Sequence, residues 1–523
     1  MDSSRLTEIR RNQAMTSYNQ QNPTRKQFIS TIDYLEADIG GMPTIFRHAI
    51  TGSQLPLLTD DSDDSEDNAR IQPAVLSALS DMLAHCASQN FGPTRGSRFF
   101  YIFFFSVTAS YNTIAGSKTG IHDTWDWGVR ATVDTSLYSW MQQTLAFCMP
   151  SLIPGWTNGV TSYTSNFTTF SARWTTWYTT RQADGSVSAL TPPPYTDLNH
   201  NTTTNEITYI NVATSQNFND TANYQDPARW TPLMIGTSKK NYLTYGWGSV
   251  TSPSLSNSDE TAAIAAADVY YASGAARTAE ILSLLAVTQT LTDEQKVIAE
   301  FWAGGPNTVA PPGISIWFWK EYMLCQTVSL NTFFYSGLDL AIGLFEAGRL
   351  CWTIKRNHMQ ARPIQEIRRT YPSSNITKYD GTTVLGNVWI PFQPSNVVTP
   401  PFPDFPSGHS TFTQIFANIM TDWFGSNLPT AVAPFSQVSL LSPILRSQSG
   451  RYGNFTIASN SLEVQTTVPA SPVTLSFTTW QDMANQAGMS RLYGGIHAES
   501  ANSGGQTLAN SLRVKQKANW PLR

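Results

Sequence analysis

Residues 315–346 are the part of this sequence that most restricts its fold, because they predict a long, largely buried helix with room for one break. The most apolar part, Phe333 to Phe345, is interrupted by Asp339. The aromatic run from Phe99 to Phe105 is also far shorter than the roughly 20 apolar residues that a bilayer requires. We therefore expect a large helical core and no membrane span.

Helical periodicity is present in two blocks, 73–150 and 258–514, which a middle rich in Thr, Asn, Gly and Pro connects. The middle, 151–250, is expected to be irregular with short strands, residues 364–405 to be loop, and residues 430–478 to form hairpins. The predicted fold class is mainly α, with two helical bundles in one large body and minor β hairpins. The other helices are expected at 97–115, 123–148, 407–422, 479–493 and 497–514.

Three domains are expected from this pattern. They are a polar N-terminal extension over residues 1–70, an N-terminal helical bundle with the irregular segment over 71–250, and a C-terminal helical bundle over 251–523. The C-terminal bundle is expected to carry the functional site.

Charge, cysteines and the N-terminus exclude several classes of protein. Lys and Arg number 33 against 37 Asp and Glu, so the basic excess of a nucleic-acid binder is missing. The four cysteines, at positions 86, 148, 325 and 351, are far apart and are expected to be buried free thiols. The start lacks a basic and apolar leader, so we expect no secretory signal peptide. A soluble protein is expected, either cytoplasmic or released by a route that needs no such peptide.

The first motif that carries chemistry runs from Lys355 to Pro363. Lys355 and Arg362 are seven positions apart, so on one helix, ended by Pro363, they would share a face. A Lys and an Arg on a common face suit a tetrahedral oxyanion, because the guanidinium pairs with two oxygens and the ammonium acts as a point charge.

The second motif is Pro406-Ser407-Gly408-His409, which leads into an apolar helix. A turn of this kind directs the unpaired backbone N–H groups of the first helical turn toward one point, and an anion binds there. Ser407 adds a hydroxyl, and His409 adds a group that exchanges protons near neutral pH.

The third motif, from Ser490 to His497, pairs Arg491 with His497 across two glycines. Taken together, the motifs K-x6-R-P, P-S-G-H and S-R-x5-H resemble the signature shared by vanadium-dependent haloperoxidases and the type-2 phosphatidic acid phosphatase superfamily, which includes soluble bacterial acid phosphatases. The chain length, the absence of membrane spans and the 80 residues between His409 and Ser490 are similar to the haloperoxidase branch. The upstream stretches that also resemble it are 230–233, 245–248, 300–306 and 311–313.

The resemblance implies a vanadate cofactor, without haem, for which His497 would be the one direct protein ligand. His409 would take a proton from hydrogen peroxide, and Lys355 would polarise the bound peroxide. A halide would then be oxidised to hypohalous acid, which halogenates a small organic acceptor. The oxygens of vanadate would be neutralised by Lys355, Arg362 and Arg491, with Ser407 and the N–H of Gly408.

Two details bear on how such a site would work. Gly304 and Gly305 stand where the family usually has an Asp that supports the last arginine, so the support of Arg491 is left open. Phe402 and Trp352 resemble the residues at matching places of fungal chloroperoxidases, which implies a halide pocket; the alternative is that both are core aromatics.

Two other functions stay open from the sequence. A soluble acid phosphatase would use the same cage, with His497 as the nucleophile and His409 as the acid for the leaving group. A structural protein with a relict site would also fit the low charge content of 13%. The resemblance allows a homo-oligomer.

Overall fold

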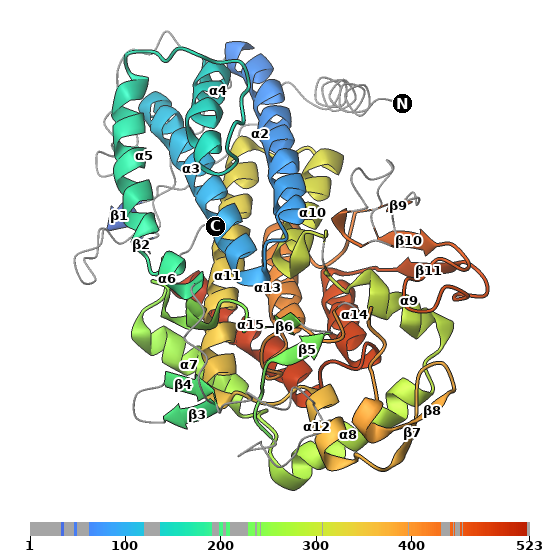
Figure 1. The fold of residues 1–523 in the computed structure, drawn as a ribbon. Helices are drawn as coiled ribbons and strands as arrows, with labels where there is room; N and C mark the ends of the chain where they lie inside the picture. Colours follow the sequence, from blue (N-terminus) through green and yellow to red (C-terminus); the bar gives the residue numbers. More distant parts are fainter. Residues whose placement is uncertain are drawn as a thin grey trace.

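The helix α11 (Leu330–His358) runs through the middle of this computed structural model (Figure 1), and most of its residues are buried. It starts at Ser329, whose side chain accepts a hydrogen bond from the backbone N–H of Thr332. The preceding helix, α10 (Ala310–Cys325), ends four residues earlier. The predicted long helix with one break is confirmed.

The structure describes most of the chain, and every structural statement below refers to this part. The described residues are 33–35, 47–49, 62–119, 136–190, 198–201, 206–209, 228–235, 238–240, 242–305, 307–395, 397–429, 440–442, 444, 450–451 and 453–519.

A glycine lets α11 approach α3 (Pro93–Thr119) closely. A Cβ on Gly337 would lie 2.3 Å from Cε1 of Phe104, which is far inside van der Waals contact. Aromatic rings fill the rest of this contact, since Tyr101 stacks on Phe345 with centroids 5.2 Å apart. The aromatic residues of α3 and α11 therefore pack against one another in the core.

Most of the N-terminal helices lie together at the top of Figure 1. The helical pattern was expected from residue 73, whereas α2 begins earlier, at Ser62. The middle, 151–250, holds short strands as expected, but it also contains α5, whose buried Phe170, Trp174 and Trp177 form an apolar face among threonines. The elements are α2 (Ser62–Ser88), α3, α4 (Leu137–Cys148), α5 (Phe167–Gln182) and the short α6 (Ser186–Leu190).

The C-terminal helices surround α13 (Gly408–Phe424), which packs against α10, α11, α14 and α15. The predicted helix from 407 and the two closing helices are confirmed. Residues 364–405 were expected to be loop, but they hold most of a short helix and a hairpin. The further helices are α7 (Asn257–Asp268), α8 (Gly274–Gln289), α9 (Asp293–Phe301), α12 (Pro363–Thr370), α14 (Trp480–Tyr493) and α15 (Glu499–Asn519).

The strands are short and pair antiparallel, which confirms a mainly α fold with minor hairpins. The expected hairpins between 430 and 478 are present as a three-stranded sheet of β9 (Gly450–Arg451), β10 (Asn454–Ile457) and β11 (Val473–Ser476). The other pairs are β1 (Asp33–Leu35) with β2 (Arg47–Ala49), β3 (Leu198–Asn201) with β4 (Glu206–Tyr209), β5 (Leu233–Ile235) with β6 (Ser238–Lys240), and β7 (Asn375–Thr377) with β8 (Thr383–Leu385).

Two further expectations concern the chain as a whole. The four cysteines form no disulfide among the described residues. Cys86, Cys148 and Cys351 are buried, as predicted, whereas Cys325 is only partly buried. None of the described helices combines the length and apolar character needed to cross a membrane. The division at residues 250 and 251 into two bundles stays a prediction.

Candidate anion-binding site

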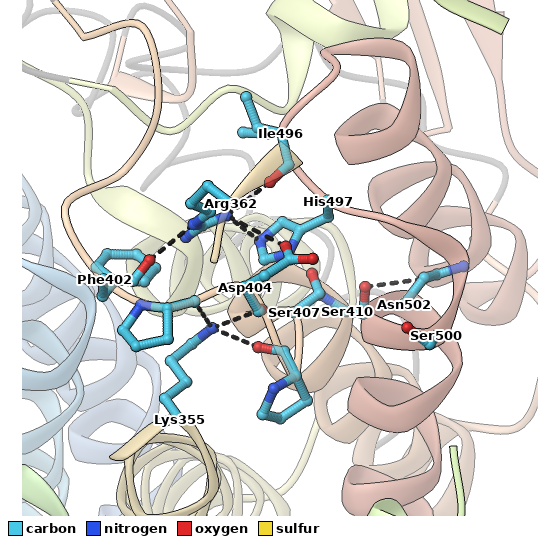
Figure 2. Close-up of polar contacts among 12 residues, drawn as sticks. Lys355, Arg362, Phe402, Asp404, Ser407, Ser410, Ile496, His497, Ser500 and Asn502 are labelled. Atoms are coloured by element: carbon cyan, nitrogen blue, oxygen red, sulfur yellow. Dashed lines mark hydrogen bonds and ion pairs between the residues drawn. The ribbon is translucent and has the colours of Figure 1, made fainter. Parts of the chain in front are cut away.

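The charged and polar residues of the three motifs come together in the interior, although they are far apart in the sequence. Figure 2 shows four of them, Lys355, Arg362, Ser407 and His497, converging from different segments. The seven predicted site residues of the motifs are buried, and the most exposed of them, His409, is only 9% exposed. The set is Lys355, Arg362, Ser407, Gly408, His409, Arg491 and His497.

The helix that carries Lys355 ends before it reaches Arg362. Met359 adopts a left-handed conformation, with φ 48°, and closes α11 at His358. Arg362 is extended, as expected for a residue before proline, and caps α12. The prediction that Lys355 and Arg362 share the face of one helix is therefore wrong, and the chain turn between them brings the two side chains together instead.

Two nitrogens of the Arg362 guanidinium form hydrogen bonds, and the third does not. Its Nε donates to the carbonyl of Phe402 at 2.7 Å, and Nη1 donates to the carbonyl of Ile496 at 2.8 Å. Nη1 also lies 2.9 Å from Nε2 of His497, and because arginine only donates, Nε2 is the acceptor. Nη2 is buried and has no hydrogen-bond partner.

Asp404 is the residue of this site that the sequence analysis missed. Its Oδ1 lies 2.6 Å from Nδ1 of His497, and its Oδ2 accepts a hydrogen bond from Nη2 of Arg277 at 2.7 Å. Burial alone would raise the pKa of this carboxyl, but the neighbouring Arg277 and His497 hold it well below its usual range. A carboxylate three residues before Ser407, in the same turn, was the available signal.

Lys355 contacts the backbone of the turn that contains Asp404. Its ammonium donates to the carbonyls of Pro403 at 2.7 Å, Asp404 at 3.0 Å and Pro406. An ammonium has three donors, so these carbonyls use all of them. Burial lowers the pKa of Lys355 to about 7. In this structure Lys355 therefore holds the turn in place.

The second motif forms the start of α13, as predicted. The Ser407 hydroxyl accepts a hydrogen bond from the backbone N–H of Ser410. His409 lies in the first turn, and its Nε2 is buried without a hydrogen-bond partner. Burial, followed by the positive charge of Arg491, lowers the pKa of His409 well below its ordinary value, so the ring is a neutral base.

Arg491 is supported by backbone carbonyls. Its Nη1 donates to the carbonyl of Trp302 at 3.2 Å and is 3.5 Å from that of Ala303. These two residues directly precede Gly304, which stands where the family usually has an Asp. Nε of Arg491 is buried without a partner. Burial, followed by the charge of Arg362, lowers the pKa of Arg491 to about 9.

Phe402 and Trp352 lie beside the basic groups. Their ring centroids are 4.8 Å apart. The Phe402 ring is 5.2 Å from Nζ of Lys355 and 4.9 Å from Cζ of Arg362, within the range of cation–π interactions. The structure thus places both aromatics against the site, and their role as a halide pocket stays a prediction.

The donor set fits a multiply charged oxyanion. Three buried groups, Nη2 of Arg362, Nε of Arg491 and Nε2 of His409, have no hydrogen-bond partner among the described residues. A buried polar group without a hydrogen bond is costly, and so is a buried cation without a counter-charge. A tetrahedral or trigonal-bipyramidal oxyanion such as phosphate or vanadate would satisfy these groups and neutralise the cations.

Comparison with known proteins adds the family. Residues 337–517 match the family model described as the VCPO second helical-bundle domain. These residues belong to that domain family. The VCPO-type domain contains all three motifs and therefore every predicted site residue. The resemblance to vanadium-dependent haloperoxidases that the motifs indicated is confirmed.

Solved structures with a similar fold extend over most of the chain. The holo form of a bacterial vanadium-dependent chloroperoxidase has a TM-score of 0.57 at 13% identity and covers 82% of this chain and 93% of its own. The apo form gives 0.54 at 14%, covering 81% and 95%. A bacterial vanadium-dependent iodoperoxidase gives 0.50 at 17%, covering 85% and 95%. No curated protein matches significantly.

Proposed function

We propose that this chain is a vanadate-dependent haloperoxidase, which oxidises a halide with hydrogen peroxide to hypohalous acid that halogenates small organic acceptors. The observation that carries the proposal is the set of unpaired buried donors on Arg362, Arg491 and His409 within a VCPO-type domain. The fold of the chloroperoxidase and iodoperoxidase structures supports the same class of enzyme.

The arginines of the cage bind and orient the cofactor. Arg362 and Arg491 would neutralise the oxygens of vanadate, together with the Ser407 hydroxyl and the N–H of Gly408 at the start of α13. His497 would be the direct ligand through Nε2, which exchanges its present hydrogen bond from Arg362 for the cofactor. When bound, vanadate supplies an electrophilic centre at which peroxide becomes reactive toward halide.

His409 is suited to move the proton of hydrogen peroxide. Its ring is neutral at neutral pH because burial and Arg491 disfavour the charged form. Its Nε2 is unpaired, so it can accept a proton from an incoming ligand. The aromatic pair Phe402 and Trp352 lowers the local dielectric and strengthens the pull of the nearby cations. We assign Lys355 to the vanadate-binding group as well. Its three donors contact backbone carbonyls, so it would act through its positive charge beside Arg362 and not through a hydrogen bond.

A phosphatase is the second candidate, and the contact between Asp404 and His497 favours it. A carboxylate that orients an imidazole is the usual arrangement around a histidine that attacks or transfers a group. The same cage would hold a phosphate ester, with His409 protonating the leaving group.

Two measurements decide between these functions. One preparation is assayed for bromination of a phenol-type dye with vanadate and peroxide, and then for hydrolysis of p-nitrophenyl phosphate without vanadate. We expect bromination. Phosphate ester turnover without any bromination would instead establish the phosphatase.

The second measurement tests the ligand. Vanadate binding is followed by calorimetry in wild type and in His497→Ala. We expect the variant to lose at least tenfold in affinity for vanadate, because it lacks the proposed ligand atom. A tenfold loss corresponds to about 1.4 kcal/mol of binding free energy. Undiminished affinity would exclude His497 as the ligand.

A further inference from the structure

Arg277 lies on α8, outside the three motifs and outside the matched VCPO-type domain, yet it reaches into the site. It is only 4% exposed. Its Nη2 donates to Oδ2 of Asp404 at 2.7 Å and to Oε1 of Glu366 at 2.7 Å, and Nε donates to the same Glu366 oxygen at 2.8 Å. Nη2 also lies 3.2 Å from the carbonyl of Ala361.

The partners of Arg277 stand next to residues of the first two motifs. Ala361 directly precedes Arg362, and Glu366 lies four residues after it, in the first turn of α12. Asp404 lies three residues before Ser407. One guanidinium therefore connects two segments whose side chains form the cage.

The third motif is reached through Glu280, one turn further along α8. Nη1 of Arg277 lies 3.5 Å from Oε2 of Glu280. Glu280 in turn accepts hydrogen bonds from the backbone N–H of Ser500 at 2.9 Å and from its hydroxyl at 2.8 Å. Ser500 follows His497 by three residues, so α8 contacts the chain within or close to each of the three motifs.

Asp404 connects Arg277 to the imidazole of His497. Its Oδ2 accepts a hydrogen bond from Arg277, and its Oδ1 lies 2.6 Å from Nδ1 of His497, within ion-pair distance. Nε2 of His497 faces a donor, Arg362, and so is unprotonated. The neutral ring then carries its proton on Nδ1, toward the carboxylate, and leaves the Nε2 lone pair for the cage.

We propose that Asp404 and Arg277 are positioning residues that fix the tautomer and orientation of His497. The inference rests on the proposed function only for the identity of what His497 contacts, an oxyanion in the cage. Asp404 holds the ring with Nδ1 protonated, and Arg277 fixes the carboxylate that does so. Outer partners of this kind typically change the affinity of a metal site by 10–100-fold when they are removed.

The test uses Asp404→Asn in the full chain. The asparagine offers one oxygen, and the guanidinium of Arg277 competes for it, so the amide NH2 is turned toward Nδ1 of His497. That favours the opposite tautomer, with the proton on Nε2. The chain has only seven histidines, so ¹⁵N spectra of histidine-labelled protein resolve the ring nitrogens, and His497→Gln assigns the signals.

We expect wild type to show His497 with a protonated Nδ1, and Asp404→Asn to lose that signature and about tenfold or more in affinity for vanadate by calorimetry. An unchanged tautomer, or vanadate affinity within twofold of wild type, would overturn the proposal. Should wild type bind no vanadate, the proposed function fails, while the ¹⁵N spectra still decide the role of Asp404.

Two further variants separate positioning from stability. Arg277→Lys keeps the charge but cannot contact Asp404 and Glu366 at once, so we expect a loss of up to about tenfold in vanadate affinity with Asp404 intact. Asp339→Asn is the matched control. Asp339 is also a buried carboxylate, its Oδ1 lies 2.9 Å from Nη1 of Arg513, and this pair is not part of the cage. This substitution should lower stability and leave both the His497 spectrum and the affinity unchanged. A loss of affinity in this control, equal to that of Asp404→Asn, would reduce Asp404 to a purely structural role.

Discussion

Replacing Glu300 with Gln should remove a pH dependence of stability that the interior of this protein creates. Glu300 is 5% exposed and lies near the end of α9. Its carboxylate accepts the backbone N–H groups of Glu463 at 2.8 Å and Val464 at 2.9 Å. None of the described basic side chains forms an ion pair with it, and burial raises its pKa from 4.5 to about 7.

The sign follows from the order in which the two states lose the proton. The unfolded chain releases it near pH 4.5, whereas the folded protein keeps it until about pH 7. Between these values the folded state binds more protons, so its stability falls by about 1.4 kcal/mol for each pH unit. The total effect is about 3 kcal/mol, complete above pH 7.

Guanidinium unfolding, followed by tryptophan fluorescence, gives the free energy of unfolding of wild type and Glu300→Gln at pH 5, 6, 7 and 8. At pH 5 a protonated Glu and a Gln each offer one carbonyl oxygen, so we expect the two proteins to agree within about 1 kcal/mol. Between pH 5 and pH 8 the difference should move by about 2.5 kcal/mol in favour of the variant, because part of the total effect is already present at pH 5. Glu294→Gln, at an exposed position of the same helix, controls for the loss of a negative charge.

A difference between wild type and Glu300→Gln that stays constant from pH 5 to 8 would refute the reasoning. It would show that the two backbone hydrogen bonds offset the cost of burying the charge. If the difference in unfolding free energy instead moved in favour of wild type as the pH rises, the pKa of Glu300 would be lowered in the folded protein and not raised.

Three further predictions concern the site and the core. Gly304→Ala places a Cβ 3.3 Å from Nε2 of His409 at a backbone φ of +59°, so we expect a loss of about 1–3 kcal/mol in unfolding free energy, measured by denaturation, together with weaker vanadate binding. Phe402→His should lower chlorination of monochlorodimedone at mildly acidic pH by roughly tenfold relative to bromination, equivalent to about 1.4 kcal/mol in barrier; equal losses for both halides would argue against a halide pocket. Asp339→Asn leaves the buried Arg513 with one carboxylate fewer, and calorimetric unfolding should show a loss of about 3 kcal/mol; a change below 1 kcal/mol would contradict the pairing.

The fold was predictable where helical stretches were long. Most of the helices after 257 were expected from long apolar or Ala-rich stretches, such as α10 and α11, which are buried on nearly every face. The short α12 lies in a segment that was expected to be loop. α5 was missed, since its buried face consists of a few aromatics set among threonines, which have a weak helix propensity. The packing of those aromatics against α3 and α4 outweighs the local preference.

The site was predictable as a set of residues and less so as a geometry. The three motifs name the side chains that meet, because an oxyanion requires that combination of donors. Spacing placed Lys355 and Arg362 on one helix, whereas the left-handed Met359 ends that helix and the chain returns by a different path. Local sequence does not determine such a turn, since the conformation of Met359 depends on its buried surroundings.

The sequence by itself determined the helical class, the motif residues and the kind of ligand they suit, because periodicity and side-chain chemistry are local properties. Only the tertiary structure decided which groups are left unpaired and which are already satisfied. It brought Asp404 to His497, used the donors of Lys355 on backbone carbonyls, and supported Arg491 with carbonyls in place of a carboxylate. Arg277 illustrates the physical reason, since its contacts join segments up to 127 positions away, and hydrogen bonds between such segments depend on how the helices pack.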